Sequence, residues 1–376
     1  MQADRPRIGV DFHVFDGKFQ GSRSHLIGVF GELTRTCPEF DFVFLLEKTD
    51  TLGALPGFSG PNVFREYMPH AGAFRRLAWD LPRLRRHLKL DLLHTQYVMP
   101  FVPARGNAVT IHDVLFEPFP QFFSRVFVLR SRLFMRWAAQ RADLLFTVSE
   151  YSRGEIAQRY GVPESAIAVL HNAVDRSLFF PGSAGDERVR ARGLAPGGYL
   201  LTVGRIEPRK NHAGLVRAYA RLQGEVPPLV IVGQRDFGHG DFEQAMASLP
   251  AGRRVLVLSD VGDEELPALY RHAQIFVYPS FAEGFGMPPL EAMASGVPVI
   301  TSASTAIPEV VGDAGLLVPP ADDGALQAAL ARLLASADLR RTLAARGLER
   351  AEVFQWRKSA EVLAACYRAY FGMVTQ

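Results

Sequence analysis

The sequence is poor in cysteine and has no long uninterrupted run of apolar residues. Its 376 residues include only two cysteines, Cys37 and Cys366, which stand far apart and lack the spacing of metal ligands. This excludes a disulfide-stapled scaffold and a cysteine-based zinc site, and it favours a reducing compartment. The most apolar segment, residues 122–137, contains four arginines, each of which is costly at the centre of a bilayer. No signal peptide is recognisable, so the expected location is the cytoplasm.

The excess of positive over negative charge is also small. The formal net charge is +3 and no nucleic-acid-binding motif is recognisable, which argues against a nucleic-acid partner. The positive excess lies in the first half and is densest over residues 74–89, where the single acid Asp80 stands among Arg75, Arg76, Arg83, Arg85, Arg86 and Lys89. Two interpretations stay open for this segment: a solvated helix face, or a patch for anionic lipid or an anionic acceptor. Residues 116–137 are interpreted as core alone or as core that also lies against the inner face of the plasma membrane.

The chain does contain a regular alternation of short β-rich runs and helical patterns. Its length favours two domains over a single core. The first half holds six β-rich runs, RIGVDF, FDFVFLL, DLLHTQ, NAVTIHD, LLFTVS and IAVLHNA. Helical spacing is found between several of them, over residues 22–35, 74–88 and 122–140. Such alternation predicts βαβ units on a parallel sheet with helices on both faces.

The alternation is interrupted once and then starts again. Residues 181–198 are rich in Gly, Pro and Ser and are interpreted as a linker. Six further strand candidates follow: YLLTVG, PLVIVG, RVLVLS, QIFVYPS, VPVIT and AGLLVP. The prediction is therefore an α/β protein of two doubly wound, Rossmann-like domains, residues 1–180 and 181–356. Ligands in such sheets bind beyond the carboxyl ends of the strands, so the loops that follow each strand are the ones to inspect.

The loop of residues 279–287 carries the most informative motif. A strand is predicted to end at Pro279 or Ser280, and a helix to start near Pro288 or Pro289. Glycines in the sequence EGFGM let backbone amides approach a ligand, and a helix N-terminus favours an anion.

Two glutamates flank this expected anion site. Glu283 lies in the loop and Glu291 is expected in the first helical turn. Carboxylates beside an anion site are best explained as acceptors for hydroxyl groups of a sugar and a ribose. The simpler alternatives are a solvated loop residue for Glu283 and an acid favoured at a helix start for Glu291.

A second loop follows the strand YLLTVG and leads into a helix that is expected to begin near Asn211. Arg205 and Lys210 stand on this turn, where they could neutralise a diphosphate. The Walker pattern G-x-x-x-x-G-K is absent. By itself the loop is also compatible with an ordinary cationic surface.

The first half offers weaker signals. The strand NAVTIHD ends with His112 and Asp113, which places them toward the ligand crevice, although a lone histidine is more often structural. The loop HVFDGKFQGSRSH places Gly21 just before a helix.

Together these segments resemble a known family, the retaining glycosyltransferases of family 4, which have the two-Rossmann-domain GT-B fold. The E-x7-E element is similar to Glu283 to Glu291, and the GR…K element to Arg205 and Lys210. Residues 297–322, the sequence TIHD and residues 146–175 also resemble the family pattern. Two departures are noted: QGSRSH replaces the frequent paired glycines of the first loop, and Ser259 stands where glycine is frequent.

The resemblance implies a role for each matching residue. The expected diphosphate ligands are Arg205, Lys210 and the Gly21 loop; Glu291 holds the ribose, Glu283 the transferred sugar and His112 the reacting sugar; backbone groups of Phe285, Gly286 and Met287 contact the donor, and that of Val261 the base. No metal or other cofactor is implied, because arginine, lysine and amide groups neutralise the charge. The last helix, about residues 357–376, is expected to pack back on the first domain.

The function implied is transfer of a hexose from a nucleotide diphosphate sugar to a hydroxyl of a growing surface glycan or lipid-linked saccharide. The first domain would bind the acceptor and the second the donor. Overall similarity leans toward mannose from GDP-mannose. Two alternatives are kept: a nucleotide-sugar epimerase of similar two-domain fold, and a non-catalytic relative that binds sugar nucleotide.

Overall fold

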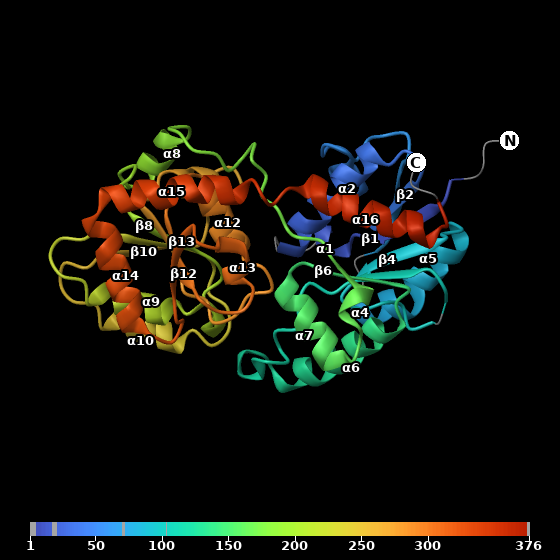
Figure 1. Ribbon diagram of the computed structural model, residues 1–376, viewed down its shortest axis with the longest axis horizontal. Helices are drawn as coiled ribbons and strands as arrows, with labels where there is room; N and C mark the ends of the chain where they lie inside the picture. Colours follow the sequence, from blue (N-terminus) through green and yellow to red (C-terminus); the bar gives the residue numbers. More distant parts are fainter. Residues whose placement is uncertain (1–4, 17–20, 70–71, 103, 374–376) are drawn as a thin grey trace. The chain divides into compact units, whose positions relative to one another are not determined.

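The computed structural model describes residues 5–16, 21–69, 72–102 and 104–373, and it divides into two compact units (Figure 1). Unit 1 comprises Met1–Asn172 and Gln355–Gln376, and unit 2 comprises Ala173–Phe354. Residues 173–180, which the sequence places in the first domain, therefore lie in unit 2, where Arg271 donates hydrogen bonds to the carbonyl oxygens of Leu178 and Phe180.

Unit 1 is built on a seven-stranded parallel sheet with the order β3-β2-β1-β4-β5-β6-β7. Its strands are β1 (Arg7–Asp11), β2 (Asp41–Leu46), β3 (Val63–Tyr67), β4 (Leu92–Gln96), β5 (Asn107–Thr110), β6 (Leu144–Thr147) and β7 (Ile167–Val169). Its α-helices are α1 (His13–Asp16), α2 (Gly21–Thr36), α3 (Thr49–Gly53), α4 (Ala73–Arg75), α5 (Leu81–His87), α6 (Arg125–Arg141), α7 (Glu150–Tyr160) and α16 (Trp356–Tyr370).

Helix α16 comes from the far end of the chain and lies beside α2 (Figure 1). Gly28 allows the close approach, because a Cβ at this position would lie 2.2 Å from the indole of Trp356. Two other side chains of α16, Leu363 and Tyr367, are buried in one core with Phe30 of α2 and with residues of strands β1 and β2. The hydroxyl of Tyr367 is 2.6 Å from Nδ1 of His94 on β4, which ties the helix to the sheet.

Strand β3 was not predicted from the sequence. It lies at the edge of the sheet, and the side chains of Phe64, Arg65 and Tyr67 are exposed. An edge strand of this kind has no continuous apolar run, so the pattern that reveals central strands is absent.

The basic segment 74–89 is helical but does not present all its cations to solvent. After α4 the backbone forms one π-helical turn, η1 (Arg76–Asp80), before α5 begins. Arg76 is buried and its Nε lies 3.3 Å from Oδ2 of Asp11, at the carboxyl end of β1. Arg85 is half-buried and donates to Asn107 Oδ1. The interpretation as a uniformly solvated face is therefore wrong for these two arginines.

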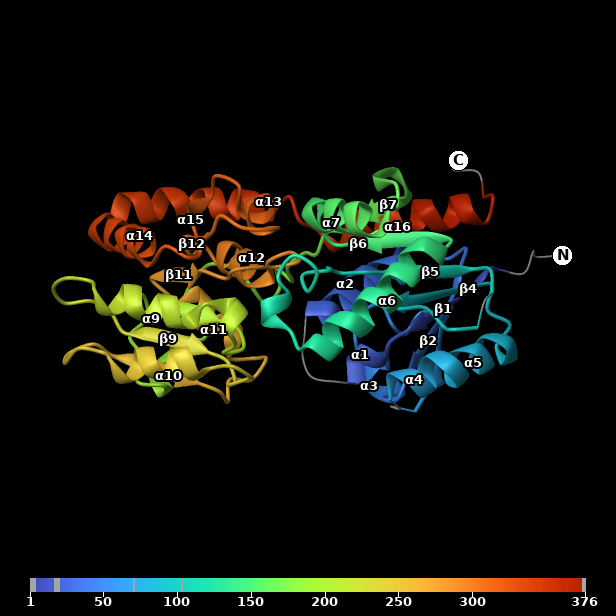
Figure 2. The same ribbon diagram turned by 90° about the horizontal axis from the view of Figure 1, so that it is seen from below.

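Unit 2 is built on a six-stranded parallel sheet with the order β10-β9-β8-β11-β12-β13 (Figure 2). Its strands are β8 (Leu200–Val203), β9 (Leu229–Val232), β10 (Val255–Leu258), β11 (Ile275–Tyr278), β12 (Val299–Ser302) and β13 (Gly315–Val318). Its α-helices are α8 (Asp186–Ala191), α9 (His212–Ala220), α10 (Gly240–Ala247), α11 (Leu266–Arg271), α12 (Met287–Ala294), α13 (Ile307–Val311), α14 (Asp323–Ala335) and α15 (Ala337–Ala351).

The predicted linker of residues 181–198 is part of this unit. It contains α8, which packs against α11, and Arg192 pairs with both Glu265 and Asp260. The interval is therefore folded, although its Gly, Pro and Ser content resembles that of a flexible connection.

Both sheets confirm the predicted doubly wound topology. In unit 1 the strand order reverses between β1 and β4, and in unit 2 between β8 and β11. A crevice at the carboxyl ends of the two strands that flank such a reversal is the usual ligand site. None of the helices in the described part of the chain is both long and apolar enough to span a membrane.

Candidate functional site

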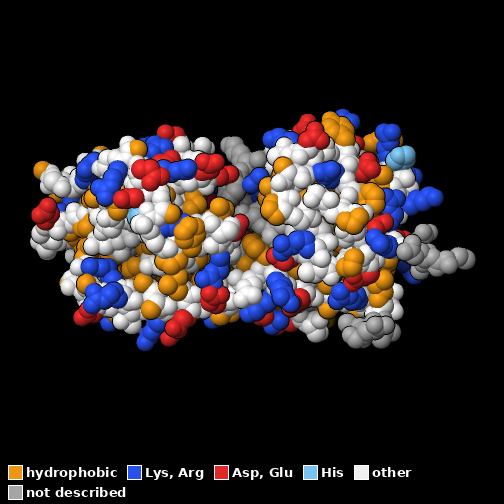
Figure 3. All heavy atoms as spheres, turned by 90° about the horizontal axis from the view of Figure 1, so that it is seen from above, with side chains coloured by type: hydrophobic (Ala, Val, Ile, Leu, Met, Phe, Trp, Pro, Cys, Tyr) orange, Lys and Arg blue, Asp and Glu red, His pale blue; other side chains and the backbone are white. Residues whose placement is uncertain are grey.

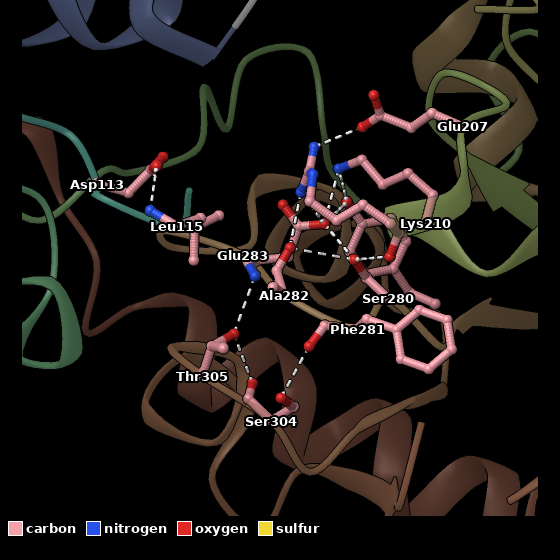
Figure 4. Close-up of polar contacts among 12 residues, drawn as sticks. Asp113, Leu115, Glu207, Lys210, Ser280, Phe281, Ala282, Glu283, Ser304 and Thr305 are labelled. Carbon is pink, nitrogen blue, oxygen red and sulfur yellow. Dashed lines mark hydrogen bonds and ion pairs between the residues drawn. The ribbon is translucent and has the colours of Figure 1, made fainter. Parts of the chain in front are cut away.

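A buried cluster of charged side chains lies at the carboxyl ends of β8 and β11. Lys210 ends a 3-10 turn, η4 (Pro208–Lys210), that follows β8, and Glu283 lies in the loop after β11. Lys210 Nζ is 2.7 Å from Glu283 Oε1, and the two side chains are only 13% and 11% exposed (Figure 4). The structure thus brings together two residues that were singled out on separate loops of the sequence.

Glu283 receives further donors at the same oxygen. Ser280 Oγ donates to Oε1 over 2.5 Å and the hydroxyl of Tyr278 over 2.9 Å, while Arg209 Nη1 lies 3.1 Å away. Every hydrogen bond of this side chain to described residues goes to Oε1, so Oε2 is left without one. One oxygen therefore anchors the carboxylate, and the other remains as an acceptor.

The cluster keeps Glu283 ionised. Burial alone would raise its pKa, but the positive charges of Lys210 and Arg209 outweigh this and lower the pKa to about 2. Burial lowers the pKa of Lys210, and the carboxylate of Glu283 opposes that shift. Arg209 also pairs with the buried Glu207 over 2.6 Å, so the four charges of the cluster sum to zero.

Hydrogen bonds to backbone groups hold the loop after β8 against the loop after β11. The amide of Phe281 donates to the carbonyl of Arg209, and the guanidinium of Arg209 donates to the carbonyl of Ala282. From the loop after β12, Thr305 Oγ1 accepts a hydrogen bond from the amide of Glu283 over 2.9 Å (Figure 4). The backbone at Glu283 is therefore held through the two residues that precede it and through a third loop.

Helix α12 starts next to this cluster and one residue earlier than predicted. Gly286 precedes it with φ +118°, a conformation that favours glycine, and Met287 is its first residue. Because Pro288 and Pro289 have no N–H, the free donors of this helix start are few. Within the described chain the amides of Gly286 and Met287 make no hydrogen bond, so they can bind an anion.

Glu291 does not lie in the first helical turn, as was expected. The early start of α12 puts it in the second turn, where it is partly buried. Burial raises its pKa to about 7, and the neighbouring phenol of Tyr270 opposes this shift. Its role at the helix start is therefore not the ordinary one of an acid beside the positive end of a helix.

Arg205 lies apart from the cluster. Its Nη1 is 2.7 Å from Oδ2 of Asp236, and its side chain is 53% exposed. No hydrogen bond or ion pair joins it to Lys210 or Glu283. Val261 lies in the coil after β10 and is partly exposed.

Four residues of the cluster were missed in the sequence. Glu207 and Arg209 lie just before Lys210, Tyr278 ends the strand β11, and Ser280 lies three residues before Glu283. In the sequence, only their nearness to residues already selected points to them. The direction of each side chain cannot be predicted, because it depends on how the two loops meet.

In unit 1 the predicted residue His112 is buried after β5. Its Nε2 donates to Oε1 of Gln96 over 2.7 Å, and its ring lies 4.9 Å from that of His25. Burial lowers the pKa of His112 well below its ordinary value, and His25 and His94 act in the same direction. The ring is therefore neutral, with Nδ1 as its hydrogen-bond acceptor.

Gly21 is the exposed first residue of α2. The preceding part of its loop, residues 17–20, lies outside the described residues. Among the residues that the structure describes, no three His, Cys, Asp or Glu side chains are grouped so that they could hold a metal ion.

Comparison with known proteins identifies the family. Residues 190–350 match the family model described as glycosyl transferases group 1, and residues 31–178 match that of glycosyltransferase family 4. The O-antigen chain mannosyltransferase B of Escherichia coli is 36% identical over 288 residues, which are 75% of this chain and 74% of that protein. The O-antigen chain mannosyltransferase RfbU of Salmonella typhimurium is 30% identical over 237 residues, which are 63% of this chain and 62% of that protein.

Solved structures agree on the fold. Sucrose-phosphate synthase from Thermosynechococcus elongatus is 24% identical with a TM-score of 0.77, over 98% of this chain and 100% of that one. Anabaena HepE in complex with UDP-glucose is 20% identical with a TM-score of 0.76, over 96% of this chain and 99% of that one. This chain is a glycosyltransferase with the GT-B fold, and it belongs to family 4.

Proposed function

We propose that this glycosyltransferase moves a hexose from a nucleotide diphosphate sugar to a hydroxyl of a growing surface glycan or lipid-linked saccharide, with retention of the anomeric configuration. The observation that carries the proposal is the pairing of Lys210 with Glu283 beside the unpaired amides of Gly286 and Met287. Cations, a hydroxyl acceptor and anion-binding amides are the groups that a sugar diphosphate requires.

The donor diphosphate is the part of the substrate for which the site has the most donors. Lys210 and Arg209 would share their charge between Glu283 and the phosphate oxygens, and the amides before α12 would bind the same anion. Because breakage of the sugar–phosphate bond builds negative charge on the leaving diphosphate, these donors stabilise the transition state more than the ground state. The proposed reaction uses these donors, and no metal, to stabilise the leaving diphosphate.

Glu283 and Glu291 would hold hydroxyl groups. Oε2 of Glu283 has no partner among the described residues and would accept from the transferred sugar. Glu291 would bind the ribose, Val261 the base through its backbone, and the neutral imidazole of His112 a hydroxyl of the reacting sugar. Arg205 would contribute to phosphate binding after it leaves Asp236.

Mannose is the sugar favoured by the curated relatives, and GDP-mannose is the donor that we propose for it. Two of them are named as O-antigen chain mannosyltransferases, and a third, from Mycolicibacterium hassiacum and 36% identical over 241 residues, as a mannosyltransferase. By contrast, the HepE structure holds UDP-glucose. The chain covers only 56% of the Mycolicibacterium protein and 62% of RfbU, so the relatives alone do not transfer their acceptors to it.

A donor screen with product analysis tests the proposal. GDP-mannose, UDP-glucose, dTDP-glucose and ADP-glucose are incubated with the protein and a panel of lipid-linked or soluble saccharides, in EDTA. Formation of an acceptor enlarged by one α-linked hexose is the expected result. A changed nucleotide sugar without transfer would indicate the epimerase alternative. Nucleotide binding without turnover on any acceptor would indicate the non-catalytic relative.

A matched pair of variants tests which cation serves the diphosphate. We expect Lys210→Met to lower kcat/KM about 100-fold or more, as removal of a preorganised charge stabiliser does. Arg205→Met should cost less than about tenfold, because Arg205 is half-exposed and engaged with Asp236. The opposite order would show that the phosphate lies outside the buried cluster. Thermal unfolding of both variants shows whether a loss of activity comes from a loss of stability. Only the replacement of Lys210 is expected to lower the stability, because only Lys210 is buried.

A further inference from the structure

A buried carboxylate lies at the carboxyl end of β1, one of the two strands that flank the reversal of strand order in unit 1. Asp11 is the last residue of this strand and is fully buried. Its Oδ1 accepts a hydrogen bond from Nδ1 of His13 over 2.8 Å, and its Oδ2 lies 3.3 Å from Nε of Arg76. We call these three residues the Asp11 cluster. It lies where a sheet of this topology usually binds its ligand.

The charge of Asp11 fixes which nitrogen of His13 is available to a ligand. Burial would raise the pKa of Asp11, but the neighbouring His13 and Arg76 outweigh this and lower the pKa to about 2. Because an ionised carboxylate only accepts hydrogen bonds, Nδ1 of His13 carries the ring proton. Nε2 of the neutral ring is then an acceptor, and it has no hydrogen bond to the residues that the structure describes.

The stability of the fold does not explain the charges of the Asp11 cluster. The amide of His13 donates to Oδ1 of Asp11 over 3.2 Å, but an uncharged asparagine or serine caps a helix as well as an aspartate does. Asp11 Oδ2 and Arg76 Nε are buried, and neither has a hydrogen bond within the described chain. A buried ion pair with unsatisfied atoms contributes little to stability. Such atoms call for another explanation, such as a ligand.

Arg76 enters the cluster from an unusual backbone turn. It is the first residue of the π-helical turn η1, and such turns are frequently found at functional sites. The residue is only 9% exposed, yet its side chain makes no hydrogen bond to any described residue. Its terminal nitrogens are therefore available as donors. Because His13 and Arg76 contact the two oxygens of one carboxylate, their free nitrogens can serve two groups of the same small ligand.

We propose that His13 and Arg76 bind two hydroxyl groups of one acceptor sugar, with Asp11 as the residue that positions them. Nε2 of His13 accepts from one hydroxyl, and the terminal nitrogens of Arg76 donate to a second. A neutral saccharide suits the cluster better than an anion, because Asp11 already balances the charge of Arg76. This inference rests on the proposed function, since it concerns the acceptor of the same transfer.

The exposed charges of unit 1 offer no comparable contact. On the face of this unit that Figure 3 presents, acidic and basic side chains are interspersed. Exposed pairs such as Arg5 with Asp41 are screened by solvent and are not held in one geometry. Burial instead fixes the geometry of the Asp11 cluster. The cluster should therefore select acceptor sugars by the positions of two hydroxyl groups.

Two replacements of His13 separate a ligand contact from a structural one. The amide of asparagine lies near the position of Nδ1, so His13→Asn keeps a donor for Asp11 and loses the atom at Nε2. The amide of glutamine reaches the position of Nε2, so His13→Gln keeps the group that faces the ligand. We expect His13→Asn to raise the acceptor KM about tenfold, and His13→Gln to raise it less. The reverse order would show a purely structural role and overturn the inference.

Arg76→Lys tests the second group of the site. It keeps the charge beside Asp11 but removes the guanidinium fork, so the acceptor KM should again rise about tenfold. The matched controls are His87→Asn and Arg83→Lys, at exposed positions of α5, which should leave the acceptor KM unchanged. In all of these variants the affinity for nucleoside diphosphate should be unchanged, because its proposed cluster lies in unit 2. Thermal unfolding shows whether each variant is folded.

Direct binding of saccharides distinguishes failure of this inference from failure of the proposed function. Methyl glycosides of mannose, glucose and galactose, and any acceptor found in the donor screen, are titrated into the wild type and His13→Asn and followed by saturation-transfer NMR. Binding that is lost in His13→Asn supports the inference even if no transfer is found. The inference is overturned if none of them binds the wild type, or if His13→Asn binds them equally well. Transfer with an unchanged acceptor KM in His13→Asn would overturn the inference and leave the proposed function standing.

Discussion

At the scale of single residues, the pairing of Glu283 with Lys210 leads to predictions about turnover, ligand binding and acid stability. Four donors converge on one of its oxygens, and the second oxygen has no hydrogen bond within the described chain. Glu283→Gln keeps the shape but removes the charge that competes with a diphosphate for Lys210. We expect turnover to fall about 100-fold or more and the dissociation constant of the nucleoside diphosphate to change by less than about tenfold. Steady-state kinetics and calorimetric titration measure the two quantities, and an unchanged turnover would exclude the role given to Glu283.

The same carboxylate has a consequence for acid stability. Its pKa is lowered from an ordinary 4.5 to about 2, so its stabilising contribution is complete above pH 4.5 and is lost as the pH falls toward 2. The shift corresponds to about 3 kcal/mol at most, because the burial of Lys210 offsets part of it. Urea unfolding between pH 6 and pH 3 should therefore show a steeper loss of stability in the wild type than in Glu283→Gln. Equal slopes would mean that the pair does not control acid unfolding.

For Glu291 we predict the opposite dependence of stability on pH, because its pKa is raised and that of Glu283 is lowered. Burial raises its pKa to about 7, so the carboxylate is half-protonated near neutrality, and what it contributes to stability is lost as the pH rises from 4.5 to 7. If it accepts hydrogen bonds from ribose, the affinity for nucleoside diphosphate should fall up to about tenfold between pH 8 and pH 6. In Glu291→Gln the affinity should be lower at pH 8 and nearly independent of pH. A wild-type affinity that is flat over this range would exclude the ribose contact.

Sequence patterns located some of these residues and not others. Glu283 and Lys210 stood out because each follows a predicted strand at the expected crevice. Arg205 satisfied the same criterion, yet it turns to Asp236 instead. Arg209 has no distinguishing feature in the sequence, and it enters the cluster because the η4 turn and the loop after β11 exchange backbone hydrogen bonds. Which of two neighbouring cations points inward is set by such long-range contacts.

At the scale of elements, strands with an apolar run were predictable, including the edge strands β7, β10 and β13, and the exposed edge strand β3 was not. All six strands of unit 2 coincide with apolar runs, because parallel strands covered on both faces need apolar side chains on both sides. Strand β3 has solvent on part of its surface and leaves no such run. The folded helix α8 in the interval 181–198 was hidden for a different reason, since its short pattern is flanked by residues that also occur in linkers.

The start of α12 depends on one glycine. Gly286 has φ +118°, and a Cβ there would lie 2.6 Å from Ile307 Cδ1. We expect Gly286→Ala to destabilise the protein by roughly 1–3 kcal/mol through backbone strain and this contact, and to weaken nucleotide binding by moving the amide of Met287. Urea unfolding and calorimetric titration measure the two effects.

Two further variants give this test its controls. Gly240→Ala, at the first position of α10 with no neighbouring atom within 4 Å, should change stability by less than about 0.5 kcal/mol. Adding Ile307→Val to Gly286→Ala removes the contacting Cδ1 and should restore only part of the loss. A full restoration would show that the contact, and not the backbone conformation, requires glycine.

At the scale of the whole molecule, the chain leaves unit 1 at Asn172 and returns to it at Gln355. The return was expected from the family resemblance and not from any pattern in the last helix, since an amphipathic helix can pack on either unit. The structure shows what it packs on: Leu363 and Tyr367 share a core with Phe30. Unit 2, in contrast, is continuous in sequence and has a core of its own.

This difference predicts how fragments of the chain behave. Residues 173–354 should fold alone, unfold cooperatively in urea and bind nucleoside diphosphate, because the Lys210–Glu283 cluster and α12 lie entirely within them. Residues 1–172 should aggregate or unfold, because the loss of α16 exposes Phe30 and leaves His94 without the hydroxyl of Tyr367. Joining residues 355–376 to residue 172 through a Gly/Ser linker should restore a cooperative transition. If residues 1–172 unfold as cooperatively as this joined form, then α16 is an accessory of unit 1 and not part of its core.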